Sequence, residues 1–326
     1  MRNEDVVLNV ENLTVYYELE EETVKAVNNV NLKLARGKTL GLVGETGAGK
    51  TTTALSLLRL VQMPPGVIKS GQITVCGNDI LSLPLNKMEE IRGNDISMIF
   101  QDPMTSLNPV FTIGWQITEA VRLHQKQKAG EAKARALEML RLVEIPDPEK
   151  RYHEYPHRLS GGMRQRAMIA MALCCQPDLL IADEPTTALD ATIQAQILAL
   201  IDKLKKSLGM AVLLITHDMG VVAEIADRVL VMYAGRIVEE TTRISLLNNA
   251  FHPYTKGLLA CIPGLGSRRK LLPAIEGVIP DADSYPPGCA FSPRCPVKQE
   301  ACDKHVPLLT PTAYGKCACF VAGKSA

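Results

Sequence analysis

The stretch that decides the fold runs from Lys38 to Val61 and reads KTLGLVGETGAGKTTTALSLLRLV. It moves from a short apolar strand into a glycine-rich turn and then into a helical pattern of alanines and leucines. The turn fits G-x-x-x-x-G-K-S/T, with Gly44, Gly49, Lys50 and Thr51 at its fixed positions. A chance glycine-rich turn is the alternative, and the order of strand, turn and helix argues against it.

Each residue type in this turn has a physical reason. Glycines let backbone N–H groups turn inward around a phosphate, and the helix that begins near Lys50 adds its partial positive charge. The ammonium of Lys50 reaches the outer phosphates, and the hydroxyl of Thr51 suits Mg²⁺, which binds through few protein groups and phosphate oxygens. The sequence therefore predicts a site for a nucleoside triphosphate and Mg²⁺.

Two adjacent carboxylates follow a second apolar strand. Residues 177–190 read PDLLIADEPTTALD, in which the strand at 179–182 is followed by Asp183 and Glu184. Neighbouring side chains on a strand point to opposite faces, so the two should have different roles. We expect Asp183 to hold the metal and Glu184 to polarise an attacking water. A surface Asp-Glu pair is the alternative, and it would not normally follow four buried strand residues.

Further motifs resemble those of the ATP-binding cassette family. LSGGMRQR at 159–166 is similar to the family's signature motif, and Gln101 in MIFQDPMTSLNP matches its Q-loop glutamine. His217 in LLITHD matches the switch histidine, with a satisfied core histidine as the alternative. The family's D-loop motif is matched by Ala188, Leu189 and Asp190. The resemblance implies an ATPase with an α/β P-loop NTPase fold: a RecA-like core, an antiparallel β subdomain and a helical subdomain, followed here by a small cysteine-rich C-terminal extension.

The resemblance also implies roles for individual residues. The expected catalytic residues are Glu184, His217 and Gln101, and the expected Mg²⁺ ligands are Thr51, Gln101 and Asp183. The residues expected to contact the chain's own ATP are Tyr17, Gly44, Glu45, Thr46, Gly47, Ala48, Gly49, Lys50, Thr51 and Thr52. The signature residues expected to cap the ATP of a second cassette are Ser160, Gly161, Gly162 and Gln165. Tyr17 would stack on the adenine, although Tyr16 beside it is an alternative.

The pattern of elements suggests how the chain is divided. Residues 6–34 and the stretch SGQITVCGNDI from Ser70 alternate apolar and polar residues like strands of a small antiparallel layer. TIGWQITEAVRLHQ and AKARALEMLRLVEI space apolar residues three and four apart, like helices. We expect an ATP-binding domain at 1–250, with a helical subdomain at about 103–173, and a C-terminal extension at 251–326.

The C-terminal third narrows the function. FHPYTKGLLACIP from Phe251, then GCAFSPRCP, resemble the extension on ATPases of dipeptide and oligopeptide importers. This implies an ATP-hydrolysing subunit at the cytoplasmic face of the cell membrane, with two transmembrane permease subunits and an extracytoplasmic peptide-binding protein as partners. Because the chain carries one cassette, the second comes from a paralogous ATPase subunit or a second copy. A nickel importer is the nearest alternative, and a soluble cassette ATPase of translation or DNA repair is further away.

Composition excludes other classes of function. The 36 basic and 35 acidic residues give a net charge of +1, which offers no global field for nucleic acid or an anionic membrane. The N-terminus lacks the basic start and apolar core of a secretory signal. Apolar runs such as AMIAMALCC from Ala167 stop short of the roughly 20 residues of a membrane-spanning helix.

Five of the nine cysteines lie close together near the C-terminus. Their spacing is not the C-x-x-C pairing usual for zinc, and it is typical of ligands for a 4Fe-4S cluster, which takes four cysteines. The importer resemblance implies such a cluster, with Cys289, Cys295, Cys302 and Cys319 as ligands, or Cys317 as the fourth. We expect it to staple a loop-rich tail that cannot build much of a core, with redox sensing as the alternative role. A zinc site with His305 and unligated thiols are the alternatives. Core packing is expected for Cys76, Cys174, Cys175 and Cys261.

Overall fold

The computed structural model describes residues 5–187, 189–262 and 274–322. The chain forms two compact units, each built from separated segments. Of the described residues, 5–8, 34–38, 75–187 and 189–213 form one unit, called the helical unit. Residues 9–33, 39–74, 214–262 and 274–322 form the other, called the phosphate-loop unit. The cassette and extension boundary expected at residue 250 divides the chain differently and stays a prediction.

The phosphate-loop unit begins with strands that line up as β2-β1-β4 in one sheet. Their bounds are Val6–Glu18 for β1, Thr23–Ala35 for β2 and Gly66–Val75 for β4. β1 and β2 form a hairpin, in which the Leu19 N–H donates to the Glu22 carbonyl at 2.9 Å. Val30, Leu32 and Leu34 of β2 are buried and alternate with exposed polar residues. This alternation is the one predicted for a sheet with one face on the core.

A second sheet of this unit carries the phosphate loop. β3 (Thr39–Val43) pairs in parallel with β9 (Arg228–Tyr233), with Leu42 opposite Leu230. β10 (Arg236–Thr242) pairs antiparallel with β9. All five residues of β3 are buried, as expected of a parallel strand covered on both faces. Helices α1 (Lys50–Leu57) and α9 (Met219–Ile225) belong to the same unit.

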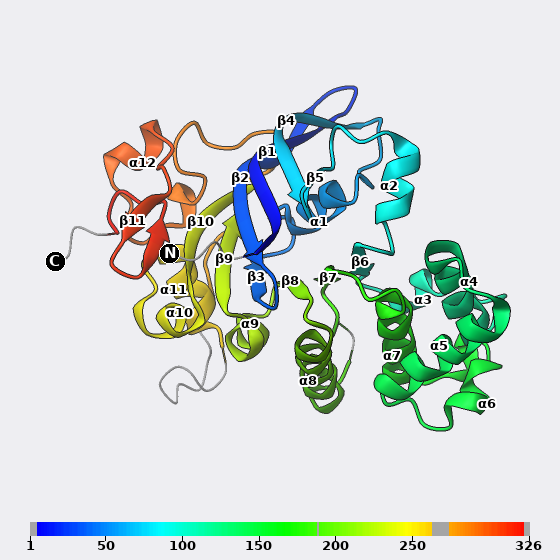
Figure 1. Ribbon diagram of the computed structural model, residues 1–326. Coiled ribbons are helices and arrows are strands. Elements are labelled where there is room, and N and C mark those ends of the chain that lie inside the picture. The colour runs from blue at the N-terminus through cyan, green and yellow to red at the C-terminus, as the bar shows by residue number, and fades with distance from the viewer. Residues whose placement is uncertain (1–4, 188, 263–273, 323–326) are drawn as a thin grey trace. The chain divides into compact units, whose positions relative to one another are not determined.

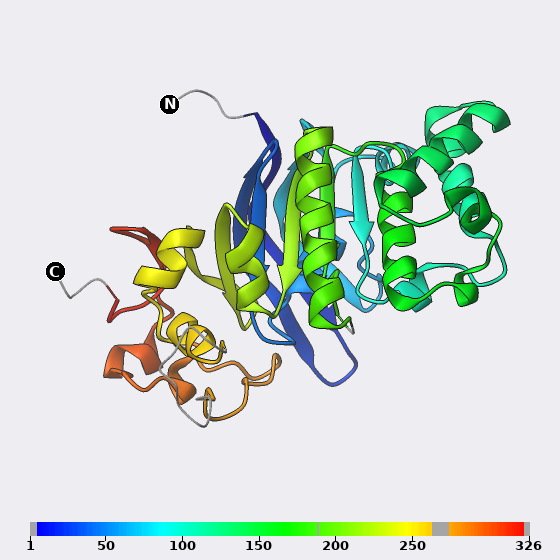
Figure 2. The same cartoon turned by 90° about the horizontal axis from the view of Figure 1, so that it is seen from below.

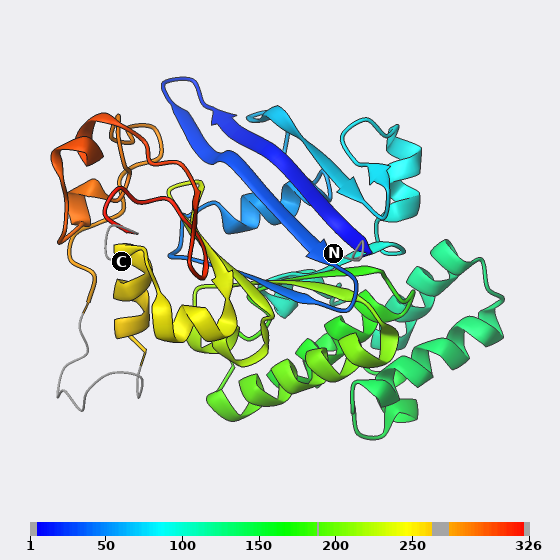
Figure 3. The same cartoon turned by 60° about the vertical axis from the view of Figure 1, so that its left-hand side comes forward.

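The C-terminal elements of the unit extend this sheet. β12 (Gly315–Cys317) pairs antiparallel with β10 and with β11 (Thr310–Thr312), so these strands lie side by side in Figure 3. Rings of Tyr233, Tyr254 and Phe291 meet in a buried cluster, with the first two centroids 4.6 Å apart. The helical elements are α10 (Arg243–Asn249), α11 (Pro253–Ala260), the 3₁₀ turn η2 (Ser292–Arg294) and α12 (Glu300–Lys304). The tail therefore shares its core with the strands of the cassette.

The helical unit contains the bundle that Figures 1 and 2 show in green. In α4, Ile113, Ile117 and Val121 are buried at helical spacing, and the Thr112 side chain caps the helix by accepting from the Trp115 N–H. α4 packs against α5, α6 and α7. The helices are α2 (Leu85–Ile91), α3 (Pro103–Ser106), α4 (Ile113–Gln125), α5 (Ala129–Leu142), α6 (Pro148–Tyr152), the 3₁₀ turn η1 (Pro156–Arg158), α7 (Gly161–Leu173) and α8 (Ala191–Leu208).

Strands β6 and β7 anchor the functional residues of this unit. β6 (Ile96–Ile99) pairs in parallel with β7 (Leu179–Asp183), whose five residues are all buried. The remaining strands are β5 (Asn78–Asp79) and β8 (Ala211–Thr216), the latter shared with the other unit. Among the residues that the structure describes, no helix combines the length and apolarity needed to cross a membrane.

Candidate functional site: a phosphate loop and its carboxylates

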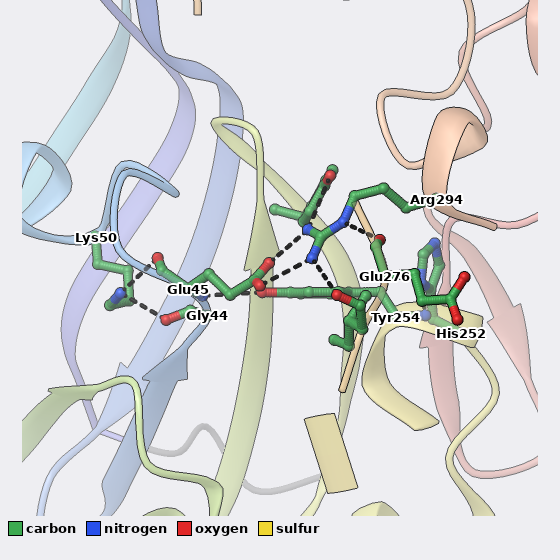
Figure 4. Close-up of polar contacts among 9 residues, drawn as sticks. Gly44, Glu45, Lys50, His252, Tyr254, Glu276 and Arg294 are labelled. Carbon is green, nitrogen blue, oxygen red and sulfur yellow. Dashed lines mark hydrogen bonds and ion pairs between the residues drawn. The ribbon is translucent and has the colours of Figure 1, made fainter. Parts of the chain in front are cut away.

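The phosphate loop lies between the end of β3 and the start of α1, and Lys50 ties it together. The Lys50 Nζ donates to the Gly44 carbonyl at 2.7 Å and to the Glu45 carbonyl at 2.9 Å (Figure 4). Lys50 is buried, while Thr46 and Gly47 at the lip of the loop are exposed. The Lys50 ammonium thus lies buried beneath the exposed Thr46 and Gly47. This arrangement suits the binding of an anionic ligand at the loop.

The glycines of the loop serve two different geometric needs. A Cβ on Gly44 would lie 2.2 Å from the Met232 carbonyl oxygen, and one on Gly49 would lie 2.2 Å from the Ala26 carbonyl oxygen. At both positions another strand's backbone occupies the space of a side chain. Gly47 has open space around it, but its φ of 84° is in the left-handed region that favours glycine.

The first turn of α1 also suits an anion. It carries no acidic residue, so nothing on the helix opposes the positive end of its dipole. Thr51, the expected metal ligand, is exposed there, and Thr53 points inward and donates to the Gly49 carbonyl at 2.9 Å. Of these two hydroxyls, that of Thr51 is the one accessible to a ligand.

The two tyrosines of β1 have different surroundings. The Tyr17 hydroxyl lies 3.4 Å from the Thr52 hydroxyl of α1, whereas the Tyr16 hydroxyl donates to the Asn28 side chain at 3.1 Å. Tyr17 is thus the tyrosine that contacts the phosphate-loop helix, and its stacking on adenine stays a prediction. Both side chains are half-buried.

In the helical unit, Glu184 accepts two hydrogen bonds on one carboxylate oxygen. The Gln101 Nε2 donates to it at 2.8 Å and the Thr187 hydroxyl at 2.9 Å. The sequence analysis did not predict the contact of Thr187 with Glu184. The only signal for it is that Thr187 lies three residues after Glu184. Two donors from different segments fix the carboxylate in one orientation, as a group that must align a water needs.

The backbone at Glu184 differs from the expectation. β7 ends at Asp183, whose side chain is buried, and Glu184 follows outside the strand with φ of 49°. The alternation of faces along a strand therefore does not separate the two carboxylates. The chain changes to a left-handed backbone at Glu184 instead, and such a conformation is uncommon for a residue with a Cβ.

The signature residues surround the N-terminus of α7. Ser160 is the N-cap, and its Oγ accepts from the Met163 N–H at 3.4 Å. Ser160 and Gly161 are exposed, and a Cβ on Gly162 would lie 3.1 Å from the Ile193 side chain. Gln165 is buried instead, because its Nε2 donates to the Pro185 carbonyl at 2.6 Å. Gln165 thus fastens α7 to the segment after β7.

The remaining motif residues stand at the ends of strands and helices. Asp190 caps α8 by accepting from the Ile193 N–H at 3.0 Å, and Leu189 is half-buried. Ala188 lies outside the described residues. His217 follows β8 and is exposed at the end of a fully buried strand.

The predicted site residues divide between the two units. Tyr17, the loop from Gly44 to Thr52 and His217 belong to the phosphate-loop unit. The helical unit contains Gln101, Asp183, Glu184, the signature residues and Asp190. The contacts that join predicted site residues within one unit are Tyr17 with Thr52, Lys50 with Gly44 and Glu45, and Gln101 with Glu184.

Two functional contacts of the loop were missed by sequence reasoning. Tyr254 of α11 accepts from the Glu45 N–H at 2.9 Å, and Arg294 of η2 forms an ion pair with the Glu45 carboxylate at 2.8 Å. Tyr254 lies in FHPYTKGLLACIP, which resembles the importer extension, but no sequence pattern links Tyr254 or Arg294 to a loop more than 200 positions earlier.

The cysteine-rich tail contradicts the prediction of an iron–sulfur cluster. None of the nine cysteines forms a disulfide, and within residues 5–187, 189–262 and 274–322 no three His, Cys, Asp or Glu side chains are arranged to hold a metal ion. The 4Fe-4S cluster and metal binding assigned to Cys289, Cys295, Cys302, Cys319 or Cys317 are therefore corrected, and the same finding removes the zinc alternative with His305.

The physical reason lies in where these thiols pack. Cys317 is buried in β12 opposite Glu239, and burial followed by that carboxylate's charge raises its pKa. Burial likewise raises the pKa of Cys289 to about 11. Both side chains thus lie in surroundings that favour the neutral thiol, as packed cysteines do. Cys289 and Cys302 meet through their backbones, where the Cys289 N–H donates to the Cys302 carbonyl at 2.7 Å.

Comparison with known families gives two matches. The family described as "ABC transporter" matches residues 27–187, which include the phosphate loop, the Q-loop glutamine, the signature and the paired carboxylates. The family described as "Oligopeptide/dipeptide transporter, C-terminal region" matches residues 238–302. Tyr254 and Arg294, which contact the loop, both lie in this second match.

Similar proteins cover nearly the whole chain. "Probable peptide ABC transporter ATP-binding protein" of Sinorhizobium fredii is 51% identical over 96% of this chain and 94% of its own. "Oligopeptide transport ATP-binding protein AppD" of Bacillus subtilis is 50% identical over 97% of this chain and 96% of its own.

A solved structure agrees with the fold. The ATP-binding cassette MJ0796, in a dimeric post-hydrolysis state with ADP and Pi, shares 28% identity and a TM-score of 0.65, over 72% of this chain and 98% of its own. On identity and coverage of this extent, the chain belongs to the ABC transporter family of ATP-binding cassette proteins, among the members that carry the oligopeptide/dipeptide transporter C-terminal region.

Proposed function

We propose that this chain is the ATPase subunit that powers import of dipeptides or oligopeptides through a membrane ABC transporter. The observation that carries the proposal is the oligopeptide/dipeptide C-terminal region at 238–302, joined to a cassette whose reported relatives are named for peptide transport. None of the relatives reported above is named for nickel, so the nickel alternative has no support from them. The cassette is assigned to residues 1–250 and the extension to 251–326.

ATP binds along the phosphate loop in this proposal. The buried Lys50 ammonium and the exposed start of α1 meet the β- and γ-phosphates, and Tyr17 stacks on the adenine. The expected metal ligands fit Mg²⁺, because Thr51, Gln101 and Asp183 offer a hydroxyl, an amide oxygen and a carboxylate, all hard oxygen donors. Bound there, Mg²⁺ would neutralise charge on the phosphates.

Glu184 orients the water that attacks the γ-phosphorus. The hydrogen bonds from Gln101 and Thr187 orient the Glu184 carboxylate, which accepts a proton from the attacking water in this proposal. The new P–O bond forms as the bond to the β-phosphate oxygen breaks, giving ADP and phosphate. His217 contacts the γ-phosphate from the end of β8.

The signature helix serves a second cassette. Ser160 and Gly161 at the exposed N-terminus of α7 would cap the γ-phosphate of ATP bound to the partner, and Asp190 would line the junction. ATP then joins two cassettes, and hydrolysis separates them. The partner is a paralogous ATPase subunit or a second copy of this chain.

The helical unit offers a surface for the membrane subunits. The rings of Phe111 and Trp115 stack with their centroids 3.9 Å apart. Phe111 is 38% exposed, Trp115 is 41% exposed and the neighbouring Val110 is 69% exposed. Exposed aromatic side chains grouped in this way mark contact surfaces. We assign this patch to cytoplasmic helices of two transmembrane subunits, which an external peptide-binding protein supplies, so the chain sits peripherally on the cytoplasmic face.

The proposal is tested in membrane vesicles that contain the assembled transporter. Glu184→Gln should lower ATP hydrolysis and peptide uptake by about 100-fold or more, because the water loses its base, while ATP binding persists. Lys50→Ala should lose ATP binding itself. Hydrolysis at the wild-type rate by the Glu184 variant would refute its catalytic assignment.

The substrate is tested separately, in a strain that lacks the gene for this chain. Growth on defined dipeptides or oligopeptides as the amino-acid source should fail and return with the wild-type gene, while ⁶³Ni uptake stays unchanged. Lost nickel uptake with normal growth on peptides would instead establish the nickel alternative.

A further inference from the structure

One carboxylate stands in a loop that is shaped for anions. Glu45 is the second residue of the phosphate loop, and its side chain is 27% exposed. Arg294 meets it with a two-point pair: Nη1 donates to Oε2 at 2.8 Å and Nη2 to Oε1 at 3.1 Å (Figure 4). This fork-like geometry is the strongest form of an Arg–carboxylate contact.

Arg294 is itself fixed by the C-terminal extension. Its Nε donates to the Glu276 carbonyl at 3.1 Å and its Nη2 to the Ile275 carbonyl at 3.3 Å. The guanidinium lies beside Tyr233, 5.9 Å from the ring centroid, and only 4% of the side chain is exposed. The extension therefore presents a buried, oriented cation to the phosphate loop.

The same residue of the loop is held through its backbone. The Glu45 N–H donates to the Tyr254 hydroxyl at 2.9 Å, and the Glu45 carbonyl accepts from Lys50 at 2.9 Å. Tyr254 is fully buried and packs edge-on against Tyr233. Glu45 thus links the lysine of the loop on one side to two residues of the extension on the other.

This arrangement has an electrostatic consequence. A carboxylate released into the loop would repel the triphosphate, which carries the same sign of charge. Arg294 both neutralises Glu45 and directs it toward the extension, and Tyr254 keeps the adjoining backbone in place. An unrelated surface ion pair would have neither effect on a bound nucleotide.

We propose that Arg294 is a positioning residue for the phosphate loop, acting through Glu45, so that the C-terminal extension sets the affinity of the cassette for ATP. The proposal rests on the nucleotide site proposed above. It gives the extension a part in ATP binding in addition to whatever it contacts in the transporter.

The test measures nucleotide affinity of the purified full-length chain by calorimetry. Arg294→Gln should weaken ATP binding by about tenfold and ADP binding by less, because the repulsion grows with phosphate charge. Arg228→Gln is the matched control, since Arg228 is an exposed arginine of the same unit that pairs with another carboxylate, that of Glu240. Its ATP affinity should equal that of the wild type.

A double-mutant cycle separates positioning from general damage. Adding Glu45→Gln to Arg294→Gln should recover about fivefold of the lost ATP affinity, because no unpaired carboxylate remains. The single Glu45→Gln variant completes the cycle. A strictly additive cycle, or an Arg294→Gln variant that binds ATP like the wild type, overturns the proposal.

Two further variants keep the outcome decisive. If Arg294→Gln fails to fold, Arg294→Lys carries the test: it retains the charge but cannot make the fork, and should weaken ATP binding about threefold. Unchanged affinity in that variant overturns the positioning role. Lys50→Ala tests the nucleotide site itself. If this variant still binds ATP like the wild type, the proposed nucleotide site is wrong. If Lys50→Ala loses ATP binding but the Arg294 variants do not, only the positioning role of Arg294 is wrong.

Discussion

The phosphate loop and the signature helix are held in place by contacts of very different range. In the loop, Gly44 fits against the carbonyl of Met232, Gly49 against that of Ala26, and Glu45 donates to Tyr254. At the signature, Ser160 caps its helix through an N–H three residues away. The loop therefore depends on the whole phosphate-loop unit, whereas the signature N-terminus depends on its own first turn.

The largest effect is expected where the long-range contact is tightest. Gly44→Ala places a methyl group against the Met232 carbonyl, at 2.2 Å before any adjustment, and should lower the free energy of unfolding by about 3 kcal/mol. Gly47→Ala is the matched control, because it meets no atom within 4 Å and bears only the strain of φ 84°, about 1 kcal/mol. Urea denaturation without nucleotide measures both. Equal losses would show that the loop is not held by this close approach.

The same difference in range explains what could be predicted. The phosphate loop is a local pattern, since Gly44 and Lys50 are six residues apart, and its strand, turn and helix appear as expected. The end of β7 was also predicted, but not the left-handed backbone at Glu184. The residue types in a sequence therefore indicate the end of a strand more clearly than the backbone conformation of the residue that follows it.

The contacts of the tail were beyond the reach of sequence patterns. Arg294 and Glu45 are separated by 249 positions, and nothing in either segment indicates the pair. The cysteines illustrate the opposite error: their density suggested a metal cluster, whereas Cys302 and Cys317 are buried as packing residues. Density along the chain does not determine how side chains converge in space.

A second prediction concerns the helix that brings Tyr254 to the loop. His252 caps α11, its Nδ1 accepting from the Tyr254 N–H at 3.1 Å, and burial lowers the pKa of His252 to about 3. An unfolded histidine titrates near 6.5, so between these values the unfolded state binds more protons. The free energy of unfolding should therefore fall as pH falls from about 6.5 toward 3.

The measurement compares the wild type with His252→Asn, which keeps a side-chain acceptor for the Tyr254 N–H. Between pH 7 and pH 5 the wild type should lose about 2 kcal/mol of unfolding free energy more than the variant does. Groups that titrate in both proteins cancel in this difference. Parallel pH profiles for the two would mean that His252 is not held neutral, and the coupling of α11 to the loop would rest on Tyr254 packing alone.

The smallest effect is expected at the signature helix, where the support is local. Ser160→Ala removes an exposed cap with a 3.4 Å hydrogen bond and should lower the free energy of unfolding by about 0.5 kcal/mol. Asp190→Ala removes a shorter cap bond of 3.0 Å and a negative charge at a helix N-terminus, so about 1 kcal/mol should be lost. Urea denaturation of both variants beside Gly44→Ala gives the ranking.

A loss of unfolding free energy at Ser160 as large as that at Gly44 would mean that the signature N-terminus supports more than its own helix. In the expected case, Ser160 can be exchanged with little effect on folding, so a change in ATP hydrolysis by the same variant reports its role toward the partner's nucleotide.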